Sequence, residues 1–355
     1  MHAKTLLHSL VPVAAVALVV VVAAPASAKR SDETVAEHLV APLVFDVTRN
    51  GVLVVGQPGR VTRIAPHHDP VDLVGPSDFD IAAVSVAHNE VTYGQTTLDP
   101  VDGFPIAASL MRIGRDGVAR EVADLRAYDD TVNPDQVNTY GITGLSETCA
   151  ATLPPFVAPA PGGNDSHPYG SVTHGSTTYV ADAGGNDILA VDRSGTIRTV
   201  AVLPPTVIPV TAEAAAAFGL DPCVVAEGGM VALEPVPTDV ELGPGGQLYV
   251  STLPGGPEDG SLGANGAVYR VNPKTGAATL VASGFTSATN IAIGPRGTIY
   301  VAELFAGRVS VVAKDGSVST FRDVPLPAGL EYAGGRLYVS QNVFGDASIV
   351  SFPAP

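Results

Sequence analysis

A strand motif that recurs along this chain limits the folds open to it. A tyrosine followed by a valine stands in four segments that share one order of elements: a strand, a glycine-containing turn, the Tyr-Val strand, a loop and a third strand. These segments are 168–202, 237–281, 289–321 and 327–352, with the motif at Tyr179, Tyr249, Tyr300 and Tyr338. In the first three, a tight turn and a fourth strand follow. Repeats of this kind predict four-stranded sheets arranged radially.

Two fainter copies, 42–74 and 79–125, precede these four. Two stretches, 128–166 and 204–236, do not fit the pattern and are interpreted as insertions. Without them, six copies take about 42 residues each, which is typical of a propeller blade, whereas five or seven copies fit less well. We therefore predict an all-β, six-bladed β-propeller. A β-sandwich is the alternative, although it does not predict the recurring strand register.

The two ends of the folded chain predict how the ring closes. The last copy, 327–352, lacks a fourth strand because the chain ends shortly after it, whereas residues 35–40 form an unassigned apolar-containing strand near the N-terminus. If this strand completes the last blade, the final sheet has no exposed edge there.

Loop lengths predict which face of the ring binds other molecules. The turns between the first and second and between the third and fourth strands of each copy are short. The long loops 94–105 and 253–264 and both insertions belong to the opposite face. Long loops on one side of a rigid scaffold usually carry binding, so we expect the binding site there.

The N-terminus has the features of an export signal. Lys4 precedes an apolar run over residues 10–24, and the small residues Ala26, Ser27 and Ala28 follow. We predict a signal peptide over residues 1–28 and a single secreted, extracytoplasmic domain over 29–355, with no stable membrane insertion after cleavage. A membrane anchor is the alternative, but it would require about 20 apolar residues.

Export changes how the two cysteines are interpreted. An oxidising compartment permits a disulfide between Cys149 and Cys223, which would join the two insertions. A metal site is the alternative, but neither cysteine lies in a C-x-x-C motif. In the second insertion, Thr211 can cap a short helix over 212–218 that ends at Gly219.

Composition narrows the class of partner. The chain has 38 Gly and 30 Pro and is 46% hydrophobic and 15% charged, which is typical of a folded, turn-rich protein. With 35 acidic and 19 basic residues its formal charge is −16. This charge disfavours a nucleic-acid partner, whose phosphates require a basic face. We expect a monomer.

The sequence resembles the ScyD/ScyE family of exported propellers. The resemblance lies in 166–170 (Ser-His-Pro-Tyr-Gly), 180–189, 202–205 and 236–250, and it covers essentially the whole mature chain. It implies a bacterial secreted propeller with NHL-like repeats, and it carries over no catalytic residues. The chain departs from the family at His167, where an Asn is usual, at Pro254 to Pro257, where the family has an aromatic-rich loop, and around Cys149.

Tyr169, Tyr140 and His167 are expected near the mouth of the central channel as candidates for binding a small molecule, with packing between an insertion and a blade as the alternative. The other ligand-binding candidates are Thr238, Asp239, Thr289 and Asn290. The enzymatic alternative is a calcium-dependent lactonase of the gluconolactonase type, in which Asp239 and Asn290 would be the metal ligands. A hard cation requires six or more oxygens, so two polar side chains from six blades are few. We expect no cofactor, with calcium as the one possibility.

Three other polar groups have a structural interpretation. His67, His68 and Asp69 are expected in a solvated turn, and Asp182 and Asn186 are expected to bond turn amides. The acidic residues of the first insertion are expected in a solvated loop, with weak cation binding as the alternative: Asp129, Asp130 and Asp135.

Together these observations favour a secreted propeller without catalytic activity that presents one loop-rich face to an unknown small molecule or extracytoplasmic protein. The lactonase is the first alternative. An envelope or matrix component without a small ligand is the second.

Overall fold

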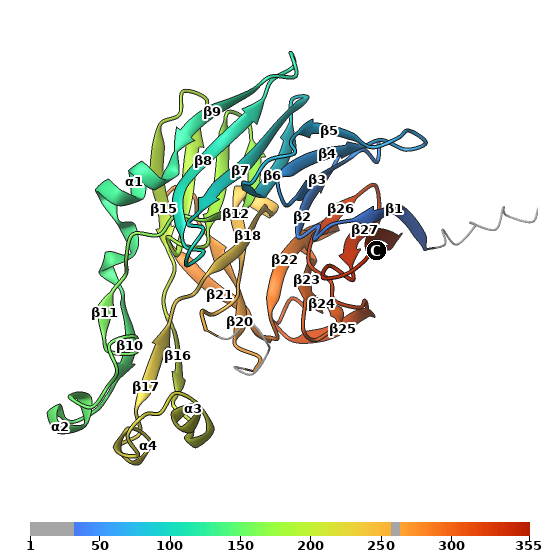
Figure 1. The fold of residues 1–355 in the computed structure, drawn as a ribbon. Coiled ribbons are helices and arrows are strands. Elements are labelled where there is room, and N and C mark those ends of the chain that lie inside the picture. The colour runs from blue at the N-terminus through green and yellow to red at the C-terminus, as the bar shows by residue number, and fades with distance from the viewer. Residues whose placement is uncertain (1–31, 257–262) are drawn as a thin grey trace, which may run out of the picture. The chain divides into compact units, whose positions relative to one another are not determined.

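The computed structural model describes residues 32–256 and 263–355 of the chain. The predicted signal peptide and part of the loop 253–264 lie outside the described residues. Within the described part, the strands form seven four-stranded antiparallel sheets, and the protein is an all-β propeller (Figure 1).

Five sheets are built from four strands that are consecutive in the chain. The first sheet contains β2 (Val44–Val47), β3 (Leu53–Gln57), β4 (Arg60–Ile64) and β5 (Val71–Val74), and the second contains β6 (Asp80–Ala87), β7 (Glu90–Leu98), β8 (Pro105–Ile113) and β9 (Ala119–Asp124). The third sheet contains β12 (Pro168–His174), β13 (Thr177–Asp182), β14 (Asp187–Asp192) and β15 (Ile197–Val202), and the fourth contains β18 (Pro237–Leu242), β19 (Leu248–Thr252), β20 (Gly266–Val271) and β21 (Ala278–Phe285). The fifth sheet contains β22 (Ala288–Ile293), β23 (Ile299–Glu303), β24 (Arg308–Val312) and β25 (Val318–Asp323).

The sixth sheet joins the two ends of the described chain. Strands β26 (Leu330–Ala333), β27 (Arg336–Gln341) and β28 (Ala347–Pro353) are completed by β1 (Glu33–Leu39), which pairs antiparallel with β28. Ala36 and Leu39 of β1 are buried in one apolar cluster with Ile349. The predicted pairing of the N-terminal strand with the last sheet is confirmed.

The first strands of these six sheets contact one another in cyclic order: β2, β6, β12, β18, β22, β26 and again β2. Each is therefore the inner strand of its sheet. The cores lie between the faces of neighbouring sheets, because the first and second strands of one sheet share apolar clusters with the next sheet.

The Tyr-Val motif supplies both sides of these cores. Successive side chains of a strand point to opposite faces. Tyr179 accordingly packs with Val240 of the following sheet, whereas Val180 packs with Leu110 of the preceding one. The other three copies behave in the same way: Tyr249 and Val250, Tyr300 and Val301, Tyr338 and Val339. The motif thus recurs because each sheet must be filled on two faces.

The two insertions form the seventh sheet together, which the repeat pattern did not predict. The first supplies β10 (Thr139–Thr143) and β11 (Ala160–Pro161), and the second supplies β16 (Thr206–Pro209) and β17 (Met230–Leu233). The order is β11-β10-β17-β16, so β10 and β17 join segments about 90 residues apart. Neither insertion could build this sheet alone.

Short helices lie in or beside the two insertions: α1 (Leu125–Val132), the 3₁₀ turn η1 (Pro134–Val137), α2 (Glu147–Ala150), α3 (Ala212–Ala217) and α4 (Cys223–Ala226). The predicted disulfide is confirmed, since Cys149 of α2 is bonded to Cys223 of α4. The predicted helix is also confirmed, with Thr211 accepting the Ala214 N–H as its N-cap and Gly219 at φ +65° just beyond its end. Among the described residues, no helix is long and apolar enough to cross a membrane.

Candidate functional site

The predicted residues of the inner strands tie neighbouring sheets together. Thr238 Oγ1 donates to the Ala288 carbonyl (2.9 Å), and Asp239 Oδ2 accepts the Ile291 N–H (3.0 Å). These bonds run from β18 to β22. At least one oxygen of Asp239 is therefore used to hold the next sheet.

Thr289 and Asn290 repeat this arrangement one sheet further on. Thr289 Oγ1 donates to the Ala328 carbonyl (3.1 Å), and Asn290 Oδ1 accepts the Leu330 N–H (3.0 Å). Asn290 has a single side-chain oxygen, so a cation at this position would compete with the Leu330 amide for it. The calcium site at Asp239 and Asn290 stays a prediction, and these bonds do not favour it.

The negative charges of acidic side chains from three inner strands, β2, β18 and β26, raise pKa values within this group. Burial raises the pKa of Asp46 to about 6 and that of Asp239 to about 7, and it raises the pKa values of Glu241 and Glu331 well above the usual range. The negative charges of neighbouring members add to the rise at Asp239, Glu241 and Glu331. Because Asp46 Oδ2 accepts the Val86 N–H (2.6 Å), it also joins its sheet to the next.

His167 and Tyr169 lie at the start of β12 and contact the preceding sheet. His167 Nε2 lies 2.7 Å from an oxygen of Asp80, the first residue of β6. Burial lowers the pKa of His167, but the hydrogen bond and charge of Asp80, together with the charges of Asp182 and Asp165, outweigh it and raise that pKa. Tyr169 packs on the apolar cluster around Tyr93. A role of either residue in ligand binding stays a prediction.

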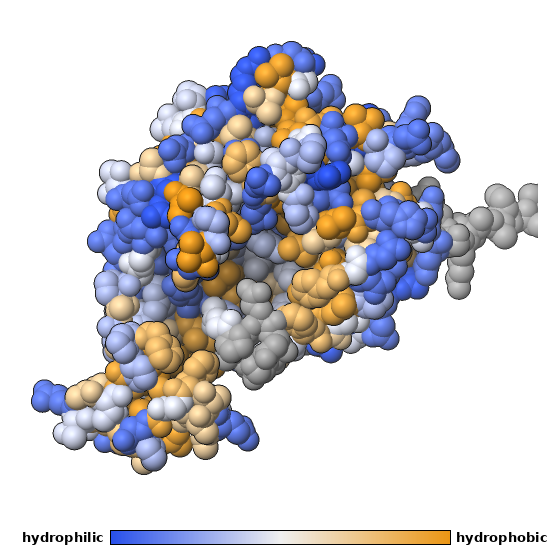
Figure 2. Space-filling view, in the orientation of Figure 1, coloured by the Kyte–Doolittle hydropathy of each residue, from blue (hydrophilic) through white to orange (hydrophobic). Residues whose placement is uncertain are grey.

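A cavity of about 480 Å³ lies against the seventh sheet. Its walls come from both insertions and from Gly255 and Gly256 in the loop after β19, so three of the four long segments that the loop lengths singled out line one space. Most of the lining is apolar, including Ile142, Val210 and Val231, with Phe156 and Phe218 at exposed positions. Figure 2 shows apolar residues gathered over the part of the molecule that carries these insertions.

The cavity has few ionisable lining residues. Tyr140 of β10 donates its hydroxyl hydrogen to Asp135 (3.3 Å) and accepts one from Asn138 (3.1 Å). Burial raises the pKa of Tyr140, and burial together with the charges of Asp135 and Asp165 raises the pKa of Glu234. The Glu234 carboxyl is the only acidic side chain of the lining residues in the described chain.

Sequence reasoning did not predict this cavity. Its walls are strands from insertions that pair across a long stretch of chain, and no local pattern indicates such a pairing. The usable signals were the two unassigned stretches and the cysteine in each of them.

The remaining predicted groups have mixed outcomes. His67, His68 and Asp69 are exposed in the turn between β4 and β5, as expected. Asp182 accepts the Gly185 N–H of its own turn, also as expected, although Asn186 Oδ1 instead accepts the distant Val236 N–H.

The prediction of a solvated acidic loop is wrong for two of its three residues. Asp130 is exposed, but Asp129 and Asp135 retain only 4% and 1% of their accessible surface. They are buried because residues 162–166 and the β13–β14 turn cover them. That packing depends on chain segments 30 to 50 residues away.

Several solved structures are similar to this chain at low sequence identity. A gluconolactonase from Xanthomonas campestris has a TM-score of 0.55 and 12% identity, with 91% of this chain and 89% of that chain covered. A putative oxidoreductase (glucose dehydrogenase) from Thermus thermophilus has a TM-score of 0.53 and 15% identity, with 90% and 99% covered.

The PQQ-bound aldose sugar dehydrogenase of Streptomyces coelicolor has a TM-score of 0.52 and 14% identity, with 90% and 97% covered. No protein-family model and no curated protein matches the chain. At these identities the comparisons establish the propeller fold alone.

Proposed function

We propose that this chain is a secreted six-bladed propeller that binds an apolar small molecule in the cavity beside its seventh sheet. The blade count rests on the cyclic contacts of six inner strands, with the seventh sheet treated as an accessory built by the insertions. The resemblance to the ScyD/ScyE family supports the proposal of export. The proposal includes a monomer and no nucleic-acid partner.

The observation that carries the binding proposal is the cavity itself. Its volume of about 480 Å³ lies within the range of small-molecule sites, and its lining is mostly apolar with few polar groups, as in such sites. The Glu234 carboxyl in the lining favours a ligand that is neutral or carries a hydrogen-bond donor over an anion. The formal charge of −16 acts in the same direction.

A second hollow, of about 700 Å³, has a different chemistry. Arg270, Arg296 and Lys314 contribute to its lining, and it lies beside the short turns rather than the long loops. Volume alone therefore does not identify the site. The mostly apolar lining and the contribution of three long segments favour the cavity of the insertions.

The calcium-dependent lactonase remains the alternative. It would place the cation at Asp239 and Asn290, whose oxygens accept backbone amides of the next sheets. These contacts assign the two side chains a structural role, so we place the binding function first. Turnover of a lactone that requires calcium and is lost in Asp239→Asn would reverse this order.

The binding proposal is tested with a neutral hydrophobic dye, N-phenyl-1-naphthylamine, titrated into the mature protein. We expect saturable fluorescence at one site. Phe156→Ala and Phe218→Ala should each weaken binding about fivefold to tenfold, since each truncation removes aromatic contact with the ligand worth about 1 kcal/mol.

Phe104→Ala is the matched control, because Phe104 is also an exposed aromatic but does not line the cavity. Its dye affinity should equal that of the unaltered protein. Absence of saturable binding, or equal affinity in all three variants, would refute the proposal.

A further inference from the structure

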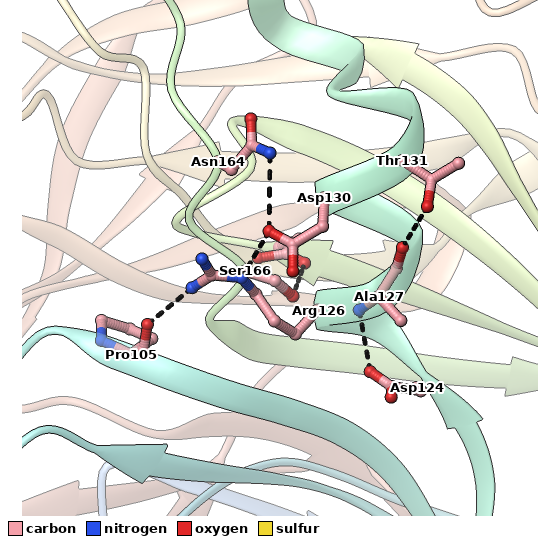
Figure 3. Close-up of polar contacts among 9 residues, drawn as sticks. Pro105, Asp124, Arg126, Ala127, Asp130, Thr131, Asn164 and Ser166 are labelled. Atoms are coloured by element: carbon pink, nitrogen blue, oxygen red, sulfur yellow. Dashed lines mark hydrogen bonds and ion pairs between the residues drawn. The ribbon is translucent and has the colours of Figure 1, made fainter.

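Five polar side chains from three segments come together where the first insertion meets the third sheet. Asp129 lies in α1, Asn133 ends α1 at φ +40°, and Asp135 lies in η1. Asp165 precedes β12, and Asp187 begins β14. Figure 3 shows one edge of this junction, with Asn164 and Ser166 beside α1.

Several contacts hold these segments against one another. Asn133 Nδ2 donates to the Gly162 carbonyl (3.2 Å), and a Cβ on Gly162 would lie 2.2 Å from Asp135 Oδ1. Asn186, next to Asp187, donates to Asp135 Oδ2 (3.0 Å). The carboxylates of Asp129 and Asp187 lie near that of Asp135, since the pKa of each is raised by burial first and then by the charges of Asp182 and Asp135.

All six buried side-chain oxygens and nitrogens that lack a hydrogen-bond partner in the described part of the chain are oxygens of these five residues. They are Asp129 Oδ2, Asn133 Oδ1, Asp135 Oδ1, Asp165 Oδ1 and both carboxylate oxygens of Asp187. Asp187 is 1% exposed. Buried polar atoms are normally hydrogen-bonded, so six unsatisfied oxygens in one place require an explanation.

Nearby cationic side chains do not provide the missing partners of these six oxygens, because they are bonded to other groups. Arg126 donates to Asp130 (2.9 Å) and to the Pro105 carbonyl (2.7 Å), at the edge shown in Figure 3. His167 is bonded to Asp80. Burial raises the pKa of Asp187 well above its usual range, but one added proton supplies a donor for only one neighbouring oxygen and leaves most of the six unsatisfied.

We propose that this junction binds one calcium ion. The ligands are the side-chain oxygens of the five residues, Asp129, Asn133, Asp135, Asp165 and Asp187. Calcium takes six to eight oxygen ligands, mainly carboxylates, amides and carbonyls, in flexible geometry. Oxygen donors without thiolates or free imidazoles favour it over zinc, and the many protein carboxylates favour it over magnesium, which retains water.

The present side-chain positions are not a finished coordination sphere. Within residues 32–256 and 263–355, no three His, Cys, Asp or Glu side chains are already grouped as a metal-ligand set. Binding therefore requires rotation of carboxylates toward a common centre. Asp182 is less available, because it already accepts bonds from Ser166, His167 and Gly185.

The axial acids provide an internal contrast. Asp46 and Asp239 accept backbone amides of neighbouring sheets, and neither has a buried oxygen without a partner. The unsatisfied oxygens thus distinguish the junction from another group of buried acids in the same chain. The proposed ion would tie α1 and η1 of the first insertion to the segment before β12 and to β14.

The test uses the mature protein freed of metal with a chelator. Calcium alone is titrated by calorimetry, and thermal unfolding is followed with and without calcium. We expect one ion per chain and a midpoint increase of about 4 °C at a hundredfold excess over Kd. Asp187→Asn and Asp129→Asn should each weaken calcium binding more than tenfold.

Asp130→Asn is the matched control, since Asp130 belongs to the same acidic stretch but is exposed and bonded to Arg126. It should bind calcium as the unaltered protein does. Circular dichroism in chelator verifies that each variant is folded, and dye binding at the cavity is measured separately.

Three results would overturn the proposal. The first is the absence of stoichiometric calcium binding at millimolar concentration. The second is binding that survives in both Asp187→Asn and Asp129→Asn, and the third is binding that is lost in Asp239→Asn alone, because either of these places the ion elsewhere.

Discussion

Asp182 and Asp187 face each other across the antiparallel strands β13 and β14, but their carboxylates have opposite environments. The Asp182 oxygens accept hydrogen bonds from Ser166 Oγ (2.6 Å), the His167 N–H (2.6 Å) and the Gly185 N–H (3.3 Å). Neither oxygen of Asp187 has a partner, although both residues are 1% exposed. One carboxylate of the pair therefore organises the turn, and the other is left with an uncompensated cost of burial.

This contrast predicts opposite effects of the same substitution. In chelator, Asp187→Asn should increase the free energy of unfolding by about 1 to 3 kcal/mol, because it removes a buried carboxyl whose desolvation no partner compensates. Asp182→Asn should decrease it by a similar amount, since its amide nitrogen cannot accept the bonds that an oxygen accepts. Urea unfolding of both variants measures the difference. Changes of the same sign would contradict the assignment.

The bond between sheets at Asp239 predicts that asparagine substitutes for aspartate there. Asn290 performs the equivalent role with an amide oxygen, so Asp239→Asn should retain the bond to the Ile291 N–H and the stability of the fold. Asp239→Ala leaves that buried amide unsatisfied and should lose about 1 to 3 kcal/mol. Thermal melts at pH 7 compare the variants. Equal losses in both would show that the charge, not the hydrogen bond, matters.

The axial acids predict that stability falls as the pH rises toward neutrality. The folded-state pKa values of Asp46 and Asp239 are raised from 3.8 to about 6 and about 7. Between the unfolded-state pKa and the folded-state pKa of each group, the folded state therefore binds more protons than the unfolded state. The stabilisation is present at low pH and is lost as the pH passes through 6 to 7. Glu241 and Glu331, whose pKa values are also raised, act in the same direction.

We expect the free energy of unfolding in chelator to decrease by on the order of 2 kcal/mol between pH 5.5 and 8. The Asp46→Asn, Asp239→Asn double variant should show a smaller decrease. Urea titrations at a series of pH values measure both. An increase in stability over this range would contradict the prediction.

The disulfide predicts local protection of the seventh sheet. It closes a loop with a sequence separation of 74 and joins the helices that flank β10 and β17. Such a loop constrains the unfolded state by about 4 kcal/mol in the chain-entropy model. In the Cys149→Ser, Cys223→Ser variant we expect faster amide exchange in β10 and β17 and little change in β22 and β23.

Alkylation verifies the bridge itself. The protein should gain no label without reductant and two labels after reduction. Labelling without reductant, or exchange that rises equally in all sheets of the double variant, would refute this prediction.

The sequence was sufficient for features that depend on near neighbours or on repetition. The Tyr-Val register predicted where strands lie because each of these sheets packs against a neighbouring sheet on both faces and therefore needs apolar side chains on both. Thr211 predicted a helix start because an N-cap bonds an amide three residues away. The two cysteines predicted their bridge because the described chain has no other thiols.

Only the tertiary structure decided which acids are buried and what each one bonds. Asp129, Asp135 and Asp187 stand in stretches of sequence that are typical of a solvated loop and turn. They are buried by segments that lie about 30 residues or more away in the sequence. The same holds for Asp239, whose partner amide lies 52 residues away. A sequence records which groups are polar, but desolvation and hydrogen bonding depend on the atoms that surround them, and those come from distant segments brought together by folding.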